Sequence, residues 1–520
     1  MAKVLFVNPM IREEDDPRHV PYGMALLAAI AVREGHLVQV YDANAWRAPD
    51  SVLAQILKAD RWDVIGIGGI TTAYRSIKHV VRMAKELAPQ ALVVAGGGFL
   101  TSMPHDILRL LPQVDLGVVG EAFVTFPEVL SRLDAGNRDW AAVPGLVWRD
   151  TGGRSRLTPE RALLEDLDQL PYPAWDLFPL DVYFKNSMAL FSEEGMLARR
   201  RLDVNASYGC SLICRFCFHL GIAGDLEHTA GRDGERDVTF THKRLIRYHS
   251  PRYVVGLVKH ARDRFGVDFI GFLDENLMTM HQSSGKKWLT EIARLWIEEG
   301  LQPQCVREGV PHDPERCSGV HWGGTSHATL VSREILTALK QAGCSHLLYG
   351  YESFSPRVLK TIGKGATVET NERSLRWTME AGIRPIPNQM IGFPDEDFDS
   401  IRDNVHAWNR LGLNASPFFA TPYPGTEWYQ VYKGRILEQY GGDLEAFLLD
   451  LGDATRITAV ISKKFNAVEL YGLRQLMVQR DLRRIAAYEA EWNRLHRSAD
   501  KPAADKENVD VSKKLRVLPA

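Results

Sequence analysis

The stretch that decides the fold is Tyr208-Gly209-Cys210-Ser211-Leu212-Ile213-Cys214-Arg215-Phe216-Cys217. It gathers three of the six cysteines of this 520-residue chain into a C-x3-C-x2-C loop, directly after the β-prone segment 202–206. Three thiolates on one short loop can ligate three irons of a four-iron cluster and leave the fourth iron open for a small molecule. A zinc site is less favoured, because Cys305 and Cys317 lie twelve positions apart and supply no second C-x2-C pair. A thioredoxin-like redox pair at Cys214 and Cys217 is a further alternative, as is a buried cysteine-rich turn.

On the C-terminal side of this loop, short β-rich runs alternate with helical stretches from about residue 203 to residue 430. The runs are 268–273, 346–351, 385–391 and 416–421. Strands that alternate with helices in this way are typical of parallel sheets. The pattern predicts a partial (β/α) barrel, followed by charged helices over 465–495.

On the N-terminal side, five β-rich runs alternate with amphipathic stretches. The runs are 4–7, 37–41, 64–67, 91–95 and 116–119, and the helical candidates lie near 22–34, 50–59, 73–87, 103–111 and 123–134. This alternation predicts a five-stranded, doubly wound parallel sheet.

Glycines follow three of these runs, at Gly68-Gly69, at Gly96-Gly97-Gly98 and at Gly120-Glu121. Ligands of such sheets bind beyond the carboxyl ends of the strands, and glycine lets the backbone approach a bulky ligand closely. This edge is therefore a candidate binding surface, although tight strand-to-helix turns would use the same residues. No G-x-G-x-x-G follows the first run, so an ordinary dinucleotide site is disfavoured.

Length and composition set the remaining bounds. A chain of 520 residues predicts about three units. The three units are an N-terminal domain over 1–140, a barrel over 201–430 and a helical region over 431–498. A proline-rich linker over 141–200 joins the first two, and a disordered tail over 499–520 follows the third. The formal net charge of -2 gives no overall field for nucleic acid or membranes. The short N-terminal apolar run and the sparse cysteines indicate a reduced, cytoplasmic location.

The cysteine loop, with an aromatic residue before its last cysteine, resembles that of the radical S-adenosylmethionine (SAM) superfamily. The resemblance continues in Asp274-Glu275-Asn276, in the G-x-E-S-like strand Tyr349-Gly350-Tyr351-Glu352-Ser353 and in the glycine motif Met390 to Glu396. It implies a [4Fe–4S] cluster on Cys210, Cys214 and Cys217, with SAM on the open iron. The positions that it implies for SAM binding are Phe216, Asp274, Glu275, Glu352, Ser353 and Gly392.

The segment Pro422-Tyr423-Pro424-Gly425-Thr426 resembles the P-x-P-G-T segment of the cobalamin-binding subgroup. The N-terminal sheet then implies a cobalamin domain. Many cobalamin domains bind cobalt through the histidine of a D-x-H-x-x-G motif. This chain lacks that motif, because His19 has the wrong spacing. We therefore expect cobalamin without a histidine ligand. Tyr74 or Arg75 is expected beneath the cobalt, unless Arg75 is simply a solvated residue of the helix. The full set expected at cobalamin is Thr71, Thr72, Tyr74, Arg75, Gly96, Gly97, Gly98, Gly120 and Glu121.

The resemblance implies an enzyme that carries a methyl group from SAM through methylcobalamin to an acceptor without a usable lone pair. Such acceptors are an unactivated carbon or a phosphinate phosphorus, as in natural-product biosynthesis of the phosphinothricin type. An anionic small molecule would meet the local cations Arg199, Arg200, Arg201, His219 and His327, unless the arginines merely solvate the linker. An electron donor such as flavodoxin or ferredoxin is expected as a partner. The alternatives are a radical cyclase or ring-remodelling enzyme and a non-catalytic iron–sulfur or cobalamin sensor.

Overall fold

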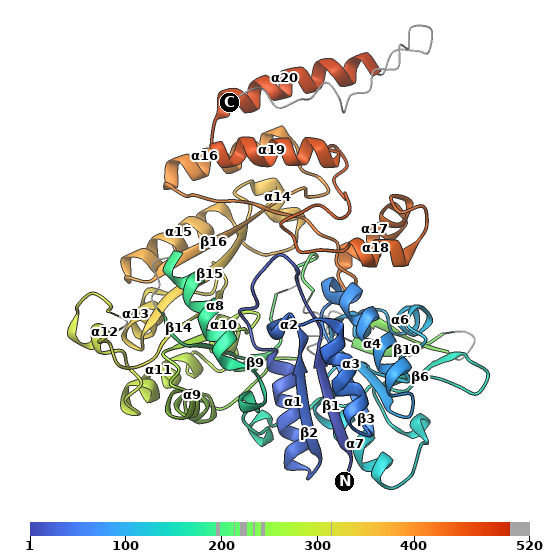
Figure 1. Ribbon diagram of the computed structural model, residues 1–520. Coiled ribbons are helices and arrows are strands. Elements are labelled where there is room, and N and C mark those ends of the chain that lie inside the picture. The colour runs from blue at the N-terminus through green and yellow to red at the C-terminus, as the bar shows by residue number, and fades with distance from the viewer. Residues whose placement is uncertain are drawn as a thin grey trace.

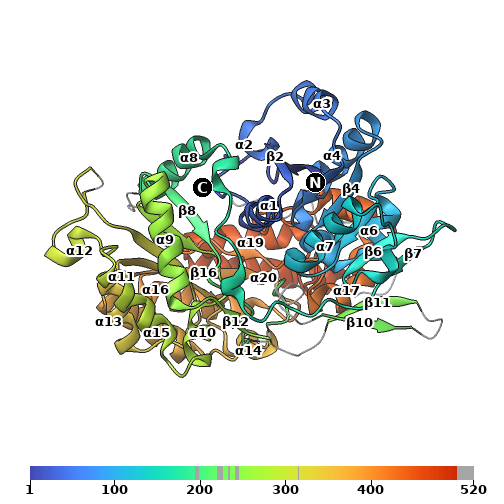
Figure 2. The same cartoon turned by 90° about the horizontal axis from the view of Figure 1, so that it is seen from below.

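Two α/β domains and a set of C-terminal helices form the protein, here in a computed structural model (Figures 1 and 2). The structure describes residues 1–193, 198–212, 214–218, 226–231, 235–240, 245–313 and 315–499. The predicted disordered tail lies outside the described residues from position 500 onward.

The N-terminal domain contains the five predicted parallel strands in one sheet. They are β1 (Lys3–Asn8), β2 (Leu37–Asp42), β3 (Val64–Gly68), β4 (Leu92–Gly96) and β5 (Leu116–Val118), in the order β2-β1-β3-β4-β5. The helices are α1 (Tyr22–Arg33), α2 (Ala43–Trp46), α3 (Asp50–Ala59), α4 (Tyr74–Leu87), α5 (Gly98–Ser102), α6 (Pro104–Leu110) and α7 (Ala122–Asp134). Helices α1 and α7 contact each other, as do α3 and α4, and the two pairs contribute to different buried clusters. The doubly wound prediction is therefore confirmed.

The region predicted as a linker is more ordered than its prolines suggested. Strands β6 (Leu146–Arg149) and β7 (Ser155–Leu157) extend the N-terminal sheet as an antiparallel hairpin, and α8 (Leu180–Glu193) follows. The run Leu146-Val147 is buried beside β5, while the tight turn that contains Gly152 and Gly153 reverses the chain. The prolines lie outside these strands, so they do not prevent pairing.

The barrel domain is an open sheet of six strands that are all parallel. They are β8 (Arg201–Val204), β13 (Phe269–Phe272), β14 (His321–Ser326), β15 (Cys344–Glu352), β16 (Arg384–Ile391) and β17 (Phe418–Phe419), in the order β17-β16-β15-β14-β13-β8. Its helices are α9 (Pro251–Phe265), α10 (Leu277–Ser283), α11 (Trp288–Glu298), α12 (Gln304–Glu308), α13 (Arg333–Gln341), α14 (Pro356–Thr361), α15 (Val368–Glu380) and α16 (Phe398–Leu411). The partial-barrel prediction is confirmed.

Strand β14 was not predicted, because the adjacent glycines Gly323 and Gly324 are more typical of a loop than of a strand. Neighbouring side chains explain both glycines. A Cβ at Gly323 would lie 2.2 Å from the His346 ring, and one at Gly324 would lie 2.7 Å from Leu277. Glycine is needed at both positions because the His346 ring and the Leu277 side chain occupy the space that a Cβ would take.

Short paired segments and C-terminal helices complete the fold. The pairs are β9 (Ser207–Tyr208) with β12 (Arg247–Tyr248), and β10 (Leu226–Ala230) with β11 (Arg236–Phe240). Helix α18 (Leu444–Asp450) contacts α4 and α17 (Glu427–Glu438), whereas α19 (Ala467–Gln479) and α20 (Leu482–Ala499) contact α16. Within the described residues, every helix is too short or too polar to cross a membrane.

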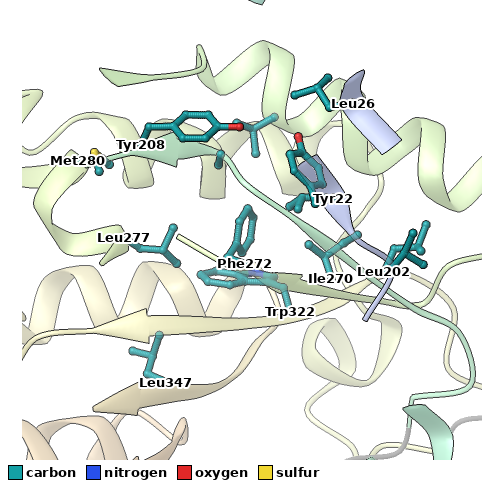
Figure 3. Close-up of a cluster of buried hydrophobic side chains, with 14 of the residues drawn as sticks. Tyr22, Leu26, Leu202, Tyr208, Ile270, Phe272, Leu277, Met280, Trp322 and Leu347 are labelled. Carbon is teal, nitrogen blue, oxygen red and sulfur yellow. The ribbon is translucent and has the colours of Figure 1, made fainter. Parts of the chain in front are cut away.

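One buried cluster joins the two domains. Figure 3 shows Tyr22 and Leu26 of α1 beside Leu202, Ile270 and Trp322 of the barrel sheet. This shared apolar core holds the two sheets against each other, since burying such side chains is the main favourable term in folding.

Candidate functional site

The cysteine loop begins at the carboxyl end of β8 and β9. Gly209 has a φ of +102°, and a Cβ there would lie 2.5 Å from the Leu245 carbonyl oxygen, so the turn requires glycine. The Cys217 N–H donates to the Cys214 carbonyl at 3.1 Å, which closes the second half of the loop. Cys210 and Cys214 are buried, Cys217 is partly buried, and none of the three is in a disulfide.

Asp274 anchors the backbone that enters this loop. Its buried carboxylate follows β13 and accepts hydrogen bonds from the Ala206 N–H at 3.1 Å and from the Ser207 hydroxyl. Burial raises the pKa of Asp274 to about 6. Asp274 therefore holds the segment that leads into the cysteine loop, and its predicted contact with SAM stays a prediction.

Helix α10 lies under the first cysteine. The Thr279 hydroxyl is 3.9 Å from Cys210 Sγ and 3.1 Å from the Ser211 hydroxyl. Burial raises the pKa of the Cys210 thiol, and the nearby Glu275 carboxylate raises it further. Glu275 thus lies near Cys210, and its predicted contact with SAM stays a prediction.

A buried ion pair that the sequence analysis missed lies against the loop. The Lys364 ammonium donates to Glu352 Oε1 at 2.7 Å, and each residue is only 6% exposed. Burial alone would lower the pKa of Lys364, but Glu352, Cys214 and Cys217 raise it above its ordinary value. Lys364 therefore supplies a positive charge beside the cluster thiols. Its signal in the sequence is the flanking pair of glycines in Gly363-Lys364-Gly365.

Glu352 is held in an unusual backbone conformation, with a φ of +59° at the end of β15. A residue other than glycine in this region costs energy and is retained where the surroundings demand it. The next residue, Ser353, is fully buried and donates its hydroxyl to Asn404 Oδ1 of α16 at 3.1 Å. Ser353 therefore holds the turn that places Glu352, and its predicted contact with SAM stays a prediction.

Gly392 follows β16 with a φ of +94°, and its N–H donates to the Glu396 carboxylate at 2.5 Å. Glu396 is buried, and burial raises its pKa to about 8. The glycine motif is thus a turn that a buried carboxyl group closes. Whether Gly392 contacts SAM remains a prediction.

The P-x-P-G-T segment joins three parts of the molecule at Gly425. Its φ is +95°, and a Cβ there would lie 2.7 Å from the Ser102 hydroxyl and 3.2 Å from the Phe218 ring. Ser102 belongs to α5 of the N-terminal domain, and Phe218 directly follows the cysteine loop. Phe216 packs on Trp428 of α17, with ring centroids 5.5 Å apart. The cysteine loop therefore lies against the glycine-rich edge of the N-terminal sheet.

That edge has the shape expected for a close-fitting ligand. A Cβ at Gly97 would lie 2.6 Å from the Gly69 carbonyl oxygen, so two backbones meet there directly. The Thr71 hydroxyl is buried and makes no hydrogen bond within the part of the chain that the structure describes. Ile70 is 45% exposed, and no atom of the described segments lies within 4 Å of a Cβ placed on Gly120. An unpartnered hydroxyl, an exposed apolar side chain and a bare backbone fit a large, partly apolar group such as a corrin.

Two predicted cobalamin contacts are not supported. The Tyr74 hydroxyl donates to Glu445 at 2.7 Å, and Arg75 donates to the Leu449 carbonyl at 2.9 Å. Both side chains are thus bound to α18 instead of lying free beneath cobalt. The reason is that the C-terminal helices pack on α4, which no local pattern reveals.

Glu121 also has another partner, because it forms a buried ion pair with Arg247 of β12. This pair joins the N-terminal domain to the strand beside the cysteine loop. Of the remaining predicted contacts, Thr72 is half-buried in the short helical turn after β3, and Gly96, Gly97 and Gly98 lie at the end of β4. His19 contacts Asp203 of β8 at 2.5 Å.

Two of the predicted substrate arginines lie away from the cysteine loop, whereas His327 follows β14 and lies near Lys364. Arg199 pairs with Asp268 at 3.3 Å and Arg201 pairs with Asp203 at 2.7 Å, at the amino end of β8, opposite the cysteine loop. Burial lowers the pKa of His327 to about 3, so this imidazole is neutral. His219 lies outside the described residues. The pairing of Arg199 and Arg201 with carboxylates therefore does not support their contact with an anionic substrate, and such a contact of the other groups stays a prediction.

Comparison with known proteins agrees with this arrangement. Residues 11–130 match the B12 binding domain, and residues 204–407 match the radical SAM superfamily. An uncharacterized methyltransferase of Pyrococcus horikoshii is 28% identical, over 79% of this chain and 78% of its own. The cytidylyl-2-hydroxyethylphosphonate methyltransferase of Streptomyces wedmorensis is 23% identical over 82% and 80%. The anaerobic magnesium-protoporphyrin IX monomethyl ester cyclase of Rubrivivax gelatinosus is 22% identical over 82% and 69%.

Among solved structures, the radical SAM methyltransferase TsrM from Kitasatospora setae, with cobalamin and a [4Fe–4S] cluster bound, superimposes with a TM-score of 0.63. It is 17% identical, and the match covers 84% of this chain and 75% of TsrM. Fold and site thus define a radical SAM enzyme with a [4Fe–4S] cluster and SAM as cofactors. More specifically, the chain belongs to the cobalamin-binding radical SAM family, with cobalamin as its third cofactor.

Proposed function

We propose that this protein transfers a methyl group from SAM, by way of cobalamin, to a carbon or phosphorus atom that has no usable lone pair. The observation that carries the proposal is the meeting of the cysteine loop, Gly425 and α5 at one point. Because the two cofactor-binding edges adjoin, a substrate held between them would face both.

When bound, the cluster and SAM supply a radical that removes a hydrogen atom, and cobalamin supplies the methyl group. The described residues support this chemistry by positioning and shielding. Asp274 and Thr279 fix the cysteine loop, and Lys364 balances the charge of the thiolates. The apolar contact of Phe216 with Trp428 helps to exclude water from the loop.

A phosphorus-containing substrate is consistent with the cytidylyl-2-hydroxyethylphosphonate methyltransferase of Streptomyces wedmorensis, whose name states a phosphonate. It is no longer supported by the cations that the sequence suggested, because Arg199 and Arg201 have carboxylate partners. An external one-electron donor, such as flavodoxin or ferredoxin, belongs to the same proposal.

The test is anaerobic turnover of reconstituted protein with cobalamin, reductant, SAM labelled in its methyl group, and phosphinate, phosphonate and carbon acceptors. We expect S-adenosylhomocysteine and 5′-deoxyadenosine in similar amounts, with label in one acceptor. Deoxyadenosine without methyl transfer would instead favour cyclisation, the chemistry that the name of the Rubrivivax gelatinosus relative states. If neither product formed while cluster and cobalamin were intact, the enzyme proposal would be wrong.

The cobalamin edge has its own test, because the Thr71 hydroxyl makes no hydrogen bond among the residues that the structure describes. Thr71→Val should weaken cobalamin retention without lowering the thermal stability of the apoprotein. Thr71→Ser keeps the hydroxyl and should retain the cofactor. Equal cobalt content in both variants would show that Thr71 does not contact cobalamin.

A further inference from the structure

A second group of metal-ligating side chains lies far from the cysteine loop. The ligand atoms of Cys305, His312, Cys317 and His321 all lie within 4.8 Å of one another. Cys305 is on α12, His321 is the first residue of β14, and the other two lie on the segment between them. Cys305 is buried and the other three are partly buried.

The distances between the ligand atoms match a tetrahedral metal site. Cys305 Sγ lies 3.6 Å from His312 Nδ1 and 3.4 Å from His321 Nε2. Zinc–sulfur and zinc–nitrogen bonds of about 2.3 and 2.0–2.1 Å, at the tetrahedral angle, separate sulfur from nitrogen by about 3.6 Å. The two imidazole rings lie nearly perpendicular, with centroids 4.6 Å apart. Both therefore present a nitrogen to the same point without stacking.

Outer contacts orient the ligands. His321 Nδ1 lies 3.2 Å from the Gly343 carbonyl, so it is the protonated nitrogen and Nε2 carries the lone pair toward Cys305. The Cys305 N–H donates to Cys317 Sγ at 3.3 Å, which holds this sulfur beside Cys305. These contacts are the kind that hold imidazole and thiolate ligands in metal sites.

The backbone is built to close this loop. Gly319 has a φ of +99°, and a Cβ there would lie 2.6 Å from the Gln302 carbonyl oxygen. The Gln304 N–H donates to the Ser318 carbonyl at 2.9 Å. The chain therefore returns on itself and brings Cys317 back beside Cys305.

We propose that Cys305, His312, Cys317 and His321 bind one structural zinc ion. A mixed set of two thiolates and two imidazoles in tetrahedral array is typical of zinc, and four protein ligands leave no open position for a substrate. Binding releases one proton from each thiol, so the complex of Zn²⁺, two thiolates and two neutral imidazoles has no net charge.

The location agrees with a structural role. His321 begins β14, so the zinc site lies at the amino ends of the barrel strands, whereas the cysteine loop lies at their carboxyl ends. Helix α12 also lies at the outer edge of the barrel, away from the N-terminal domain, in both views (Figures 1 and 2). Zinc there would fix the loop from α12 to β14. The proposal does not depend on the methyl-transfer reaction.

The first test is metal analysis of the purified holoenzyme by mass spectrometry, together with X-ray absorption at the zinc edge. We expect about one zinc per chain, with two sulfur neighbours at about 2.3 Å and two nitrogen neighbours at about 2.0–2.1 Å. This measurement needs no variant, and iron and cobalt do not interfere with it. Substoichiometric zinc in protein with full iron content, or a zinc shell of light atoms only, would overturn the proposal.

Variants then locate the ion. Replacing both cysteines, as Cys305→Ser with Cys317→Ser, should remove zinc and leave iron, while Cys344→Ser, at a buried cysteine outside the group, should retain both metals. Replacing Cys210, Cys214 and Cys217 together by alanine should remove iron and leave about one zinc. Zinc that disappeared with the cluster cysteines would be adventitious metal in the cluster site and would refute the assignment.

Discussion

The barrel carries two cysteine-containing loops, and they differ in how their ligands are arranged. The loop at the carboxyl ends of the strands presents three thiols within eight residues, which suits a polynuclear cluster with one open iron. The loop at the amino ends alternates cysteine and histidine over residues 305–321, and its four ligand atoms converge within 4.8 Å. Cysteine is thus expected to hold the catalytic cluster at the carboxyl ends of the strands and, as we propose, to hold a structural zinc ion at their amino ends.

Breaking the cluster loop should have the largest effect on activity. Cys214→Ala removes one of three thiolate ligands, so we expect SAM cleavage to fall to the background of the assay. Metal analysis should find iron lost and zinc kept. Turnover at the wild-type rate would contradict the assignment of Cys214 to the cluster.

Cys317→Ala removes one proposed zinc ligand. The variant should therefore have a lower melting temperature, because the loop from α12 to β14 is no longer fixed, and an unchanged iron content. Thermal denaturation and iron analysis on the same sample check this result. Loss of iron along with zinc would mean that the two loops are not independent.

The buried ion pair beside the cluster should dominate the stability of this end of the barrel. Lys364→Met leaves Glu352 charged and buried, which costs about 3–5 kcal/mol in buried pairs of this kind. Chemical denaturation measures this loss, and adding Glu352→Gln should recover much of it. Lys463→Met removes an exposed pair with Asp395 and should cause no measurable change. An equal effect of the two lysine variants would argue against the burial of Lys364.

The junction of the two domains should respond to Gly425→Ala. The positive φ and the Ser102 hydroxyl at 2.7 Å both oppose a side chain, so we expect a loss of about 1–3 kcal/mol together with weaker cobalamin retention. Gly434→Ala is the matched control. It lies within α17, where nothing within 4 Å opposes a Cβ, and should add about 0.5–1 kcal/mol. A neutral Gly425→Ala variant would show that the three segments do not meet closely.

The smallest expected effect concerns the pH dependence of stability. The pKa of Glu396 is raised by burial from its ordinary 4.5 to about 8, so the folded state binds a proton more tightly than the unfolded state between these values. This contribution to stability is complete at low pH and is lost as pH rises through about 8. Glu396→Gln cannot ionise, so its melting temperature relative to the wild type should rise between about pH 5 and about pH 8.5. A pH-independent difference would refute the shift.

The sequence by itself determined the alternation of strands and helices in both domains, and it predicted the cluster ligands. Alternating apolar runs and helices predicted the five parallel strands of one domain and most strands of the other. The spacing of Cys210, Cys214 and Cys217 predicted the cluster loop, because ligands on one short loop are local in sequence. Such patterns involve residues close together in the sequence, so they can be recognised without knowing the tertiary structure.

Only the tertiary structure decided which side chains meet across the molecule. Lys364 reaches the cluster loop, Arg75 turns to α18, and Arg201 pairs at the opposite end of its strand. Strand β14 was not predicted because it contains Gly323 and Gly324, where neighbouring side chains leave no room for a Cβ. The proposed zinc ligands, from Cys305 to His321, show no C-x2-C pattern in the sequence. They meet because the loop between α12 and β14 folds back on itself. Such pairings depend on distances between segments remote in sequence, which the packing of the two sheets fixes.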